Sequence, residues 1–321
     1  MIEYRVFRNT DPPRLAEVWR SQVGHFELMQ PMSMAVFERY VLSKPVFDRQ
    51  GLIVAHEADK VVGFAHAGFG PSEDQNGLST ERGVTSLVML RPEVESSVAG
   101  ELLARSEEYL RNCGAQQLYG GGNYPLSPFY YGLYGGSEFS GILQRDPRMQ
   151  TLFRAHGYQE LRRTLIFHRE LCDFRPVVDR QQLKIRRQFT IETIVDPPTT
   201  TWWEAVIFEP FERTRCLLVP KDGGPHQASV NFWNMETMIG ALGVHAVGIV
   251  GLEVIPTQRR QGLAKFLLGE ALRQMHAQHV ALAEVHVAEE NAKAGTLFCS
   301  LGFNQVDTSV LYCKDCRNTA R

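Results

Sequence analysis

The sequence is short of cysteine, of charge of one sign and of long apolar runs. Of six cysteines in 321 residues, only Cys313 and Cys316 form a CxxC pair, and no second pair completes a zinc site. The 34 basic and 36 acidic residues nearly cancel, which argues against a nucleic acid or an anionic membrane as partner. Residues 1–8 lack a signal peptide's apolar run, and no stretch reaches the roughly 18 apolar residues of a membrane span. We therefore expect a cytoplasmic protein with no metal site, no nucleic-acid partner and no membrane partner.

The chain does have enough apolar material for two cores. Hydrophobic residues make up 44% of it and aromatic residues 10%, so a disordered chain is excluded. Because a domain usually has about 150 residues, a chain of 321 residues predicts two domains.

The clearest periodic pattern lies in the last quarter of the chain. It predicts strand, helix, strand, helix and strand in turn, at 247–255, from Gly262 onward, at 280–287, at 291–299 and at 303–313. The first helix should bury a stripe at four-residue spacing, formed by Leu263, Leu267, Ala271 and Met275. This order implies neighbouring parallel strands joined by helical crossovers.

The same order of elements occurs earlier in the chain. A strand at 85–90 and a helix at 98–110 precede Leu152–Phe153. Three residues separate this pair from Gly157, just as three residues separate Leu297–Phe298 from Gly302. An internal duplication of about 150 residues explains this similarity. We expect domains at 1–175 and 180–321, with an insertion at 119–141 in the first.

The insertion at 119–141 holds seven of the 27 glycines and five of the ten tyrosines. Tight turns that carry amphipathic rings suit a recognition loop. An insertion that packs against its own domain is equally consistent with this composition. Both interpretations stay open on the sequence alone.

The turn before the helix at Gly262 is the most specific chemical feature. A strand ends, Arg259 and Arg260 follow, and the helix begins at a glycine. Free backbone N–H groups and the positive end of the helix dipole would then point at one spot, which suits a pyrophosphate. A P-loop is excluded because no Gly-Lys-Ser/Thr follows.

Two motifs in the second half resemble a known superfamily. The run Val254-Ile255-Pro256-x-x-Arg259-x-x-Gly262-x-Ala264 resembles motif A of the GCN5-related N-acetyltransferases (GNAT). The run Asn291-x-x-Ala294-x-x-x-Phe298-x-x-x-Gly302-Phe303 resembles a later motif of the same superfamily. The resemblance implies an α/β (α+β) chain with two tandem acyl-CoA N-acyltransferase folds, each a mixed central sheet flanked by helices.

The resemblance also implies acetyl-CoA as cosubstrate, bound in a V-shaped gap between the strands that end near Val254 and Val287. Main-chain groups would hold the pantetheine arm, amides of the turn the pyrophosphate, and one asparagine would contact the cofactor. The expected cofactor-binding residues are Leu252, Val254, Arg259, Arg260, Gln261, Gly262, Leu263, Ala264, Lys265 and Asn291.

The implied activity is acetyl transfer to a primary amine of a small molecule or peptide. The candidate bases are His286, because histidine titrates near neutral pH, and Glu253. Phe298 stands where many members carry a tyrosine general acid. Coenzyme A thiolate is a tolerable leaving group without one, and Tyr312 or a tyrosine of 119–141 could take the place of that acid. The same departure motivates an alternative, a non-catalytic acyl-CoA-binding or regulatory module.

The first copy departs from the motif. Glu95 takes the place of Arg259, Val98 that of Gly262, and Gly100 that of Ala264. Negative charge and a β-branched side chain both oppose anion binding, so we expect a degenerate first copy that supports the second. The aromatic residues of the second copy either line an acceptor groove or belong to a core, namely Trp202, Trp203, Phe208 and Phe211.

Overall fold

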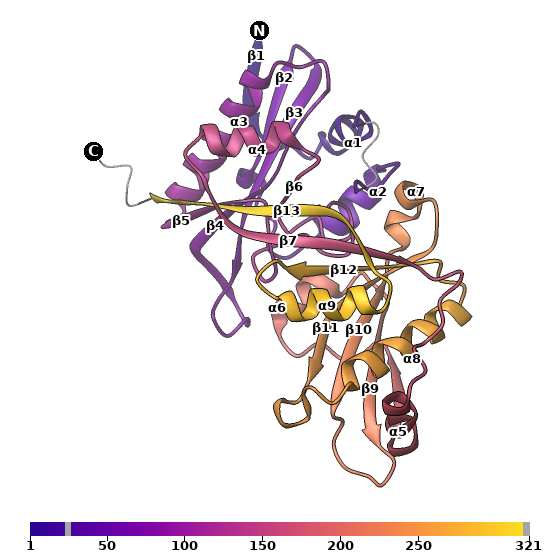
Figure 1. Ribbon diagram of the computed structural model, residues 1–321. Coiled ribbons are helices and arrows are strands. Elements are labelled where there is room, and N and C mark those ends of the chain that lie inside the picture. Colours follow the sequence, from indigo (N-terminus) through magenta and orange to yellow (C-terminus); the bar gives the residue numbers. More distant parts are fainter. Residues whose placement is uncertain (23–26, 317–321) are drawn as a thin grey trace. The chain divides into compact units, whose positions relative to one another are not determined.

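The computed structural model describes residues 1–22 and 27–316 (Figure 1). The chain divides into two compact units. The first unit comprises Met1–Thr164, Thr199–Pro210 and the chain from Asp307 onward, and the second comprises Leu165–Pro198 and Phe211–Val306. Among the helices of the described part, none combines the length and the apolar character that a bilayer span requires.

The first unit is built on a mixed sheet with the strand order β1-β2-β3-β4-β5-β13. Neighbours pair antiparallel except β4 and β5, which are parallel. Its strands are β1 Ile2–Val6, β2 Leu52–Glu57, β3 Lys60–Pro71, β4 Leu78–Leu90, β5 Gln117–Gly120, β6 Ile142–Leu143 and most of β13 Asn304–Asp315. Its helices are α1 Pro12–Arg20, α2 Met34–Phe37, η1 Glu38–Leu42, η2 Arg49–Gly51, α3 Ser96–Asn112, α4 Pro147–Ala155 and α6 Trp202–Phe208.

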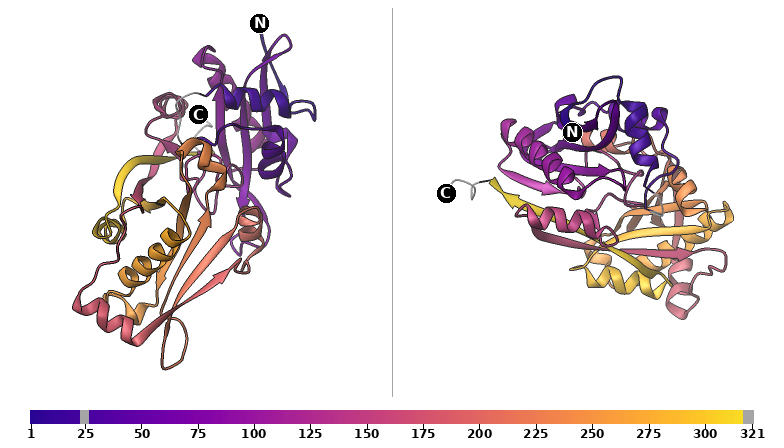
Figure 2. Two further views of the ribbon diagram at one scale, coloured as in Figure 1. Left: turned by 90° about the vertical axis from the view of Figure 1, so that its right-hand side faces the viewer. Right: turned by 90° about the horizontal axis from the view of Figure 1, so that it is seen from above.

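The second unit repeats this plan, with the strand order β7-β12-β11-β10-β9-β8 and one parallel pair, β11 and β12. Its strands are the second half of β7 Gln159–Glu170, β8 Phe189–Val195, β9 Arg213–Pro220, β10 Ala228–Asn234, β11 Ala246–Val254 and β12 Leu282–Ala288. Its helices are α5 Arg180–Gln188, η3 Glu236–Met238, α7 Ile239–Leu242, η4 Pro256–Gln258, α8 Leu263–Ala277 and α9 Ala292–Ser300. In each unit a mixed set of strands is flanked by helices, which confirms the expected fold class (Figure 2).

Helix α8 shows how the sequence pattern produces the core. Its predicted stripe of Leu263, Leu267, Ala271 and Met275 is buried and packs against the inward side chains of β9, β10, β11 and β12. Helix α3 does the same in the first unit, where Leu102, Leu103 and Leu110 are buried. The parallel pair in each unit is thus covered by the helix that connects its two strands.

The units are not the contiguous ranges 1–175 and 180–321 because each unit holds the last strand of the other copy. Strand β13 pairs with β5 in the first unit, with Tyr312 opposite Gly120. Residues 165–170 of β7 belong to the second unit, where β7 neighbours β12. The two ranges remain a prediction about the extent of the copies along the chain.

The insertion at 119–141 packs into the first unit. Phe129, Tyr130, Tyr131 and Tyr134 are all buried. The Tyr130 ring stacks on Trp19 with 5.6 Å between centroids. The structure therefore favours the packed interpretation over an exposed recognition loop.

Candidate functional site

The sheet of the second unit opens between β11 and β12. Their parallel pairing runs from Ala246 opposite Leu282 to Ile249 opposite Val285 and ends there, whereas β11 continues to Val254 beside β10. A register shift between Ser229 and Asn231 of β10 marks a bulge at this point, and bulges bend a strand. The last five residues of β11 therefore face a gap where β12 would otherwise pair.

Peptide groups of β11 point into this gap. The Ile255 N–H donates to the Gln227 carbonyl of the chain beside it, at 3.0 Å. Because successive peptide groups of a strand point to opposite sides, the N–H and C=O of Val254 point to the gap, and those of Leu252 follow two residues earlier. Arg259 Nε donates to the Val254 carbonyl at 3.1 Å, which leaves the Val254 N–H as the donor on this edge.

The turn that follows β11 forms a cluster of backbone donors. Arg260 and Gly262 both adopt left-handed conformations, with φ of 66° and 81°. Gly262 is the N-cap of α8, so the first N–H groups of the helix, through Lys265, have no partner within the helix. Neighbouring N–H groups in such a turn form an anion-binding concavity at the positive end of the helix dipole.

Helix α5 borders the same turn, which the sequence did not indicate. Gln181 Nε2 donates to the Gln261 carbonyl at 2.8 Å. A Cβ added to Gly262 would lie 3.0 Å from that Nε2 atom. Glycine is therefore favoured here by its backbone conformation, and a larger residue would also have to displace the end of the Gln181 side chain.

The Asn291 side chain has a structural role at the start of α9. It caps α9 by accepting from the Ala294 N–H at 3.2 Å. Asn291 follows strand β12, and Gly262 follows strand β11. The helices α9 and α8 therefore both begin at the carboxyl edge of the parallel pair. This is the edge at which α/β sheets usually bind ligands.

The two candidate bases differ in their environment. Glu253 lies exposed on β11. His286 on β12 has a side chain that is only 1% exposed, and its Nε2 lies 3.0 Å from Glu284 Oε1. The structure therefore gives the two candidates different surroundings, one exposed and one buried beside a carboxylate.

Glu284 instead joins His286 to a residue that the sequence analysis missed. Its second oxygen, Oε2, lies 2.7 Å from Nε2 of His168 on β7. Burial alone would raise the pKa of the Glu284 carboxyl, but hydrogen bonds from His168 and then His286 outweigh this and hold that pKa well below the ordinary 4.5. Glu284 is thus a buried carboxylate between two imidazoles. The sequence did contain a signal for Glu284, because it stands two residues before His286 and therefore on the same face of the strand.

The expected replacements for a tyrosine acid lie elsewhere. Phe298 is buried beside Phe303 in the core of the second unit. Tyr312 is fully buried in the first unit and stacks on Phe153, and the tyrosines of 119–141 belong to that unit as well. The second unit itself therefore supplies no tyrosine from these candidates.

The aromatic residues proposed for an acceptor groove divide between the units. Trp203 is buried in the first unit, where its Nε1 donates to the Pro125 carbonyl at 2.7 Å, and Phe208 contacts Tyr131 there. Phe211 packs on Trp233 in the second unit. Trp203 is thus a core residue of the first unit, and Phe208 is a half-buried residue that packs on that unit.

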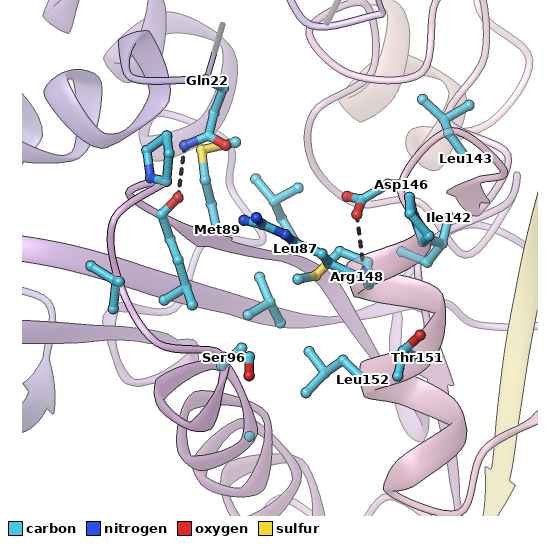
Figure 3. A pocket seen from close by; sticks show the side chains of 18 of the residues that line it. Gln22, Leu87, Met89, Ser96, Ile142, Leu143, Asp146, Arg148, Thr151 and Leu152 are labelled. Atoms are coloured by element: carbon cyan, nitrogen blue, oxygen red, sulfur yellow. Dashed lines mark hydrogen bonds between the residues drawn. The ribbon is translucent and has the colours of Figure 1, made fainter.

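The first unit opens at the corresponding point of its own sheet. Pairing of β4 with β5 ends at Thr85 opposite Gly120, while β4 continues to Leu90. A cavity of about 1120 Å³ lies beside this free edge, between β4, the first turns of α3 and helix α4 (Figure 3). Apolar side chains of β4, β6 and α4 line much of it, namely Leu87, Val88, Met89, Leu90, Ile142, Leu143 and Leu152.

The polar groups of this cavity differ from those of the second unit. Gln22 Nε2 donates to the Leu90 carbonyl at 2.8 Å, and Asp146 caps α4 by accepting from the Met149 N–H. Arg148 extends from the first turn of α4 into the cavity (Figure 3). Val98, the counterpart of Gly262, is buried in the core and does not line the cavity.

A family model identifies the second half of the chain. The acetyltransferase (GNAT) family matches residues 185–303. The matched residues include both motifs of the second half, Val254–Ala264 and Asn291–Phe303. Among curated protein sequences no significant match was found.

Solved structures share the fold over nearly the whole chain. A tandem GNAT protein from the clavulanic acid biosynthesis pathway aligns with a TM-score of 0.70 at 14% identity, over 98% of each chain. A GCN5-related N-acetyltransferase from Sphaerobacter thermophilus aligns with a TM-score of 0.65 at 16% identity, over 98% of this chain and 95% of the other. At these identities the likeness establishes the fold alone.

A third solved structure covers only part of a longer protein. It is a GCN5-related glucosamine N-acetyltransferase region of a fungal multi-domain β-N-acetylglucosaminidase, with a TM-score of 0.71 at 16% identity. The alignment covers 98% of this chain but only 38% of the fungal chain.

Within residues 1–22 and 27–316, no three His, Cys, Asp or Glu side chains cluster as a metal site.

Proposed function

We propose that the second unit transfers an acetyl group from acetyl-CoA to a primary amine. The observation that carries this proposal is the end of β11–β12 pairing at Ile249 and Val285, directly ahead of the left-handed turn at Arg260 and Gly262. A gap with free peptide groups suits an amide-bearing arm, and the turn suits a pyrophosphate. Both features occur in one unit and in the order that acetyl-CoA requires.

The residues of the second unit fit such a ligand. Peptide groups of Leu252 and Val254 would bind the pantetheine arm, and the amides from Arg260 to Lys265 the pyrophosphate. Arg259, Arg260 and Lys265 add positive charge near this turn. We assign Gln261, Leu263 and Ala264 to the same concavity through their backbone, and Asn291 to the neighbouring helix start.

Bound acetyl-CoA supplies an activated acyl carbon and a thiolate leaving group. The Val254 N–H points into the gap and can stabilise the negative charge that develops on the acyl oxygen. A base must remove a proton from the acceptor ammonium, and the sequence candidates are His286 and Glu253. Of the two, His286 has a carboxylate partner that can stabilise its protonated form.

The proposed acceptor is a primary amine on a small molecule or a peptide. The fungal structure is named as a glucosamine N-acetyltransferase region, so glucosamine belongs in a first panel of amines together with aliphatic amines, amino acids and lysine peptides. The chemistry of the gap alone does not select among them.

Calorimetry with acetyl-CoA and a CoA-release assay across this panel test the proposal. Binding together with turnover on an amine supports it. Tight binding without turnover on every amine would instead support the second candidate, a non-catalytic acyl-CoA-binding or regulatory module, which Phe298 motivates. Absence of binding would contradict both.

A further inference from the structure

Three ionisable side chains form a row across two strands of the second unit. His168 on β7 and His286 on β12 both place Nε2 against the Glu284 carboxylate, at 2.7 and 3.0 Å. The Glu284 side chain is 3% exposed and that of His286 1%, whereas that of His168 is 18% exposed. Among these three groups, His168 is the one that reaches solvent.

The row lies on the sheet face opposite α8. Phe167 of β7 and Val285 of β12 pack into the core with α8. Because side chains alternate along a strand, His168, Glu284 and His286 point to the other face. Glu284 lies opposite Gly248, one residue before the last paired residues of β11 and β12. The row therefore crosses the sheet at the level where the gap opens.

The hydrogen bonds determine which nitrogen of His168 can react. An ionised Glu284 only accepts, so the Nε2 atom of His168 must carry the hydrogen and its Nδ1 atom a lone pair. No partner of that Nδ1 atom is found within the described ranges 1–22 and 27–316. A partly exposed imidazole held by a buried carboxylate, with its other nitrogen open, is the arrangement of a general base.

We propose that His168 accepts the acceptor's proton during acyl transfer in the second unit, and that Glu284 is the positioning residue that holds it. This proposal rests on the proposed function. His286 holds Glu284 from the other side.

The proton balance of the step is complete. One proton of the ammonium passes to His168 Nδ1, directly or through one water, and the neutral amine forms the C–N bond. The C–S bond breaks, the second nitrogen proton passes to the departing sulfur, and the third stays in the amide. Glu284 remains ionised and stabilises the imidazolium, which returns its proton to solvent through the exposed Nδ1 side.

The exchange of strand β7 brings His168 into the second unit. His168 belongs to the first copy along the chain, yet β7 neighbours β12 in the second unit. A residue from one copy thereby enters the sheet that carries the acyl-transfer gap of the other.

The test uses the full-length protein with His168→Asn, Glu284→Gln and His286→Asn, and with His245→Asn as a matched control. His245 also lies in the second unit and directs Nε2 to a side-chain oxygen, Asn234 Oδ1, at 2.9 Å. We expect His168→Asn to lower kcat by about 10²- to 10⁴-fold and to remove the acid limb of the kcat/KM profile, with an unchanged Kd for acetyl-CoA. Glu284→Gln should lower kcat in the same direction, and His245→Asn should change none of these quantities.

A second measurement does not depend on activity. Nitrogen NMR of histidine-labelled protein should show His168 with its hydrogen on Nε2 in the wild type, and a mixture of tautomers in Glu284→Gln. A hydrogen on Nδ1 in the wild type, or a His168→Asn variant with unchanged rate and pH profile, would overturn the proposal. If the wild type binds acetyl-CoA but releases no CoA with any amine, the proposed function fails and the proton acceptor with it. Turnover that survives in His168→Asn removes only the assignment of the base.

Discussion

The two units repeat one hydrogen-bond arrangement at the end of a strand and then diverge. At the end of β4 the Arg91 N–H donates to Val62, and at the end of β11 the Ile255 N–H donates to Gln227. In both units the preceding carbonyl turns away from the sheet partner and accepts from a side chain, Gln22 Nε2 in the first and Arg259 Nε in the second. The open edge is therefore a property of the fold, shared by both copies.

What differs is the charge and the conformation of the turn that follows. In the first unit Glu95, in an extended conformation, is the N-cap of α3. In the second, Arg260 and Gly262 are left-handed and α8 begins after them. The comparison shows that a free strand edge supplies the space for a ligand, while a few turn residues determine which charge that space accepts.

The largest expected effect comes from reversing the charge of the second turn. Gly262→Glu should weaken acetyl-CoA binding at least about 100-fold, roughly 3 kcal/mol, because it puts a carboxylate and a strained left-handed residue where the pyrophosphate binds. Calorimetry measures the change. Gly243→Glu is the matched control, since Gly243 also has a positive φ, 73°, and a Cβ there meets nothing within 4 Å. Equal affinity in Gly262→Glu and the wild type would remove the site assignment.

A second expected effect separates the units by their response to acid. His66 is fully buried in the first unit, and burial lowers its pKa from 6.5 to about 3. Below pH 6.5 His66 is therefore protonated in the unfolded chain but stays neutral in the folded unit. The free energy of unfolding of the first unit then falls as pH falls, by up to about 1.4 kcal/mol per pH unit. The lowered pKa of Glu284 gives the second unit a contribution that is complete above pH 4.5 and is lost only below it.

Hydrogen exchange measured separately for the two units tests this difference. Between pH 6.5 and 4.5, protection should fall in the first unit and hold in the second, after correction for the intrinsic rate. His66→Phe should flatten the slope of the first unit, although it leaves the Tyr130 hydroxyl without its 2.8 Å partner. Parallel losses in both units would show that these buried groups do not distinguish them.

A smaller effect is expected when one charge of the turn is removed without disturbing its backbone. Arg260→Gly should weaken acetyl-CoA binding about tenfold, roughly 1.4 kcal/mol, yet stabilise the fold by about 1 kcal/mol because glycine adopts a φ of 66° without strain. His279→Gly is the control, since His279 is exposed in the same unit with a φ of 65°. His279→Gly should raise the free energy of unfolding measured in urea by the same amount and leave the affinity for acetyl-CoA unchanged.

The smallest expected effect tests whether the first unit takes acetyl-CoA at all. Val98 is 6% exposed in the core, so a charge there would unfold the unit, whereas Ser97 lines the cavity. Ser97→Glu should leave both the affinity for acetyl-CoA and a stoichiometry of one unchanged, within about twofold. Two equivalents bound by the wild type, with one lost in Ser97→Glu, would show that the first unit is a second acetyl-CoA site.

The features set by local sequence were predicted well. The buried stripe of α8 follows from 3.6-residue periodicity, and the turn at Gly262 follows from the residues next to it. Both could therefore be predicted from short stretches of sequence. The family relationship followed from the spacing of two such stretches.

The features that depend on strand exchange could not be predicted this way. His168 and Tyr312 each lie in the unit formed mainly by the other copy, because that placement follows from pairing between strands more than one hundred residues apart. Trp203 lies in the first unit on helix α6, which packs there. Alternation along β12 could place Glu284 beside His286, but no local pattern links it to His168.

The exchange of strands also governs the order in which this protein can be made. On the ribosome the first unit emerges with β5 already synthesised, yet the strand that pairs with β5 is β13, near the end of the chain. Until then an apolar strand edge stays open, a state that invites association with other nascent chains. At about 5–20 residues per second the wait lasts roughly 10–40 s. The first unit therefore completes its sheet only after β13 has been synthesised.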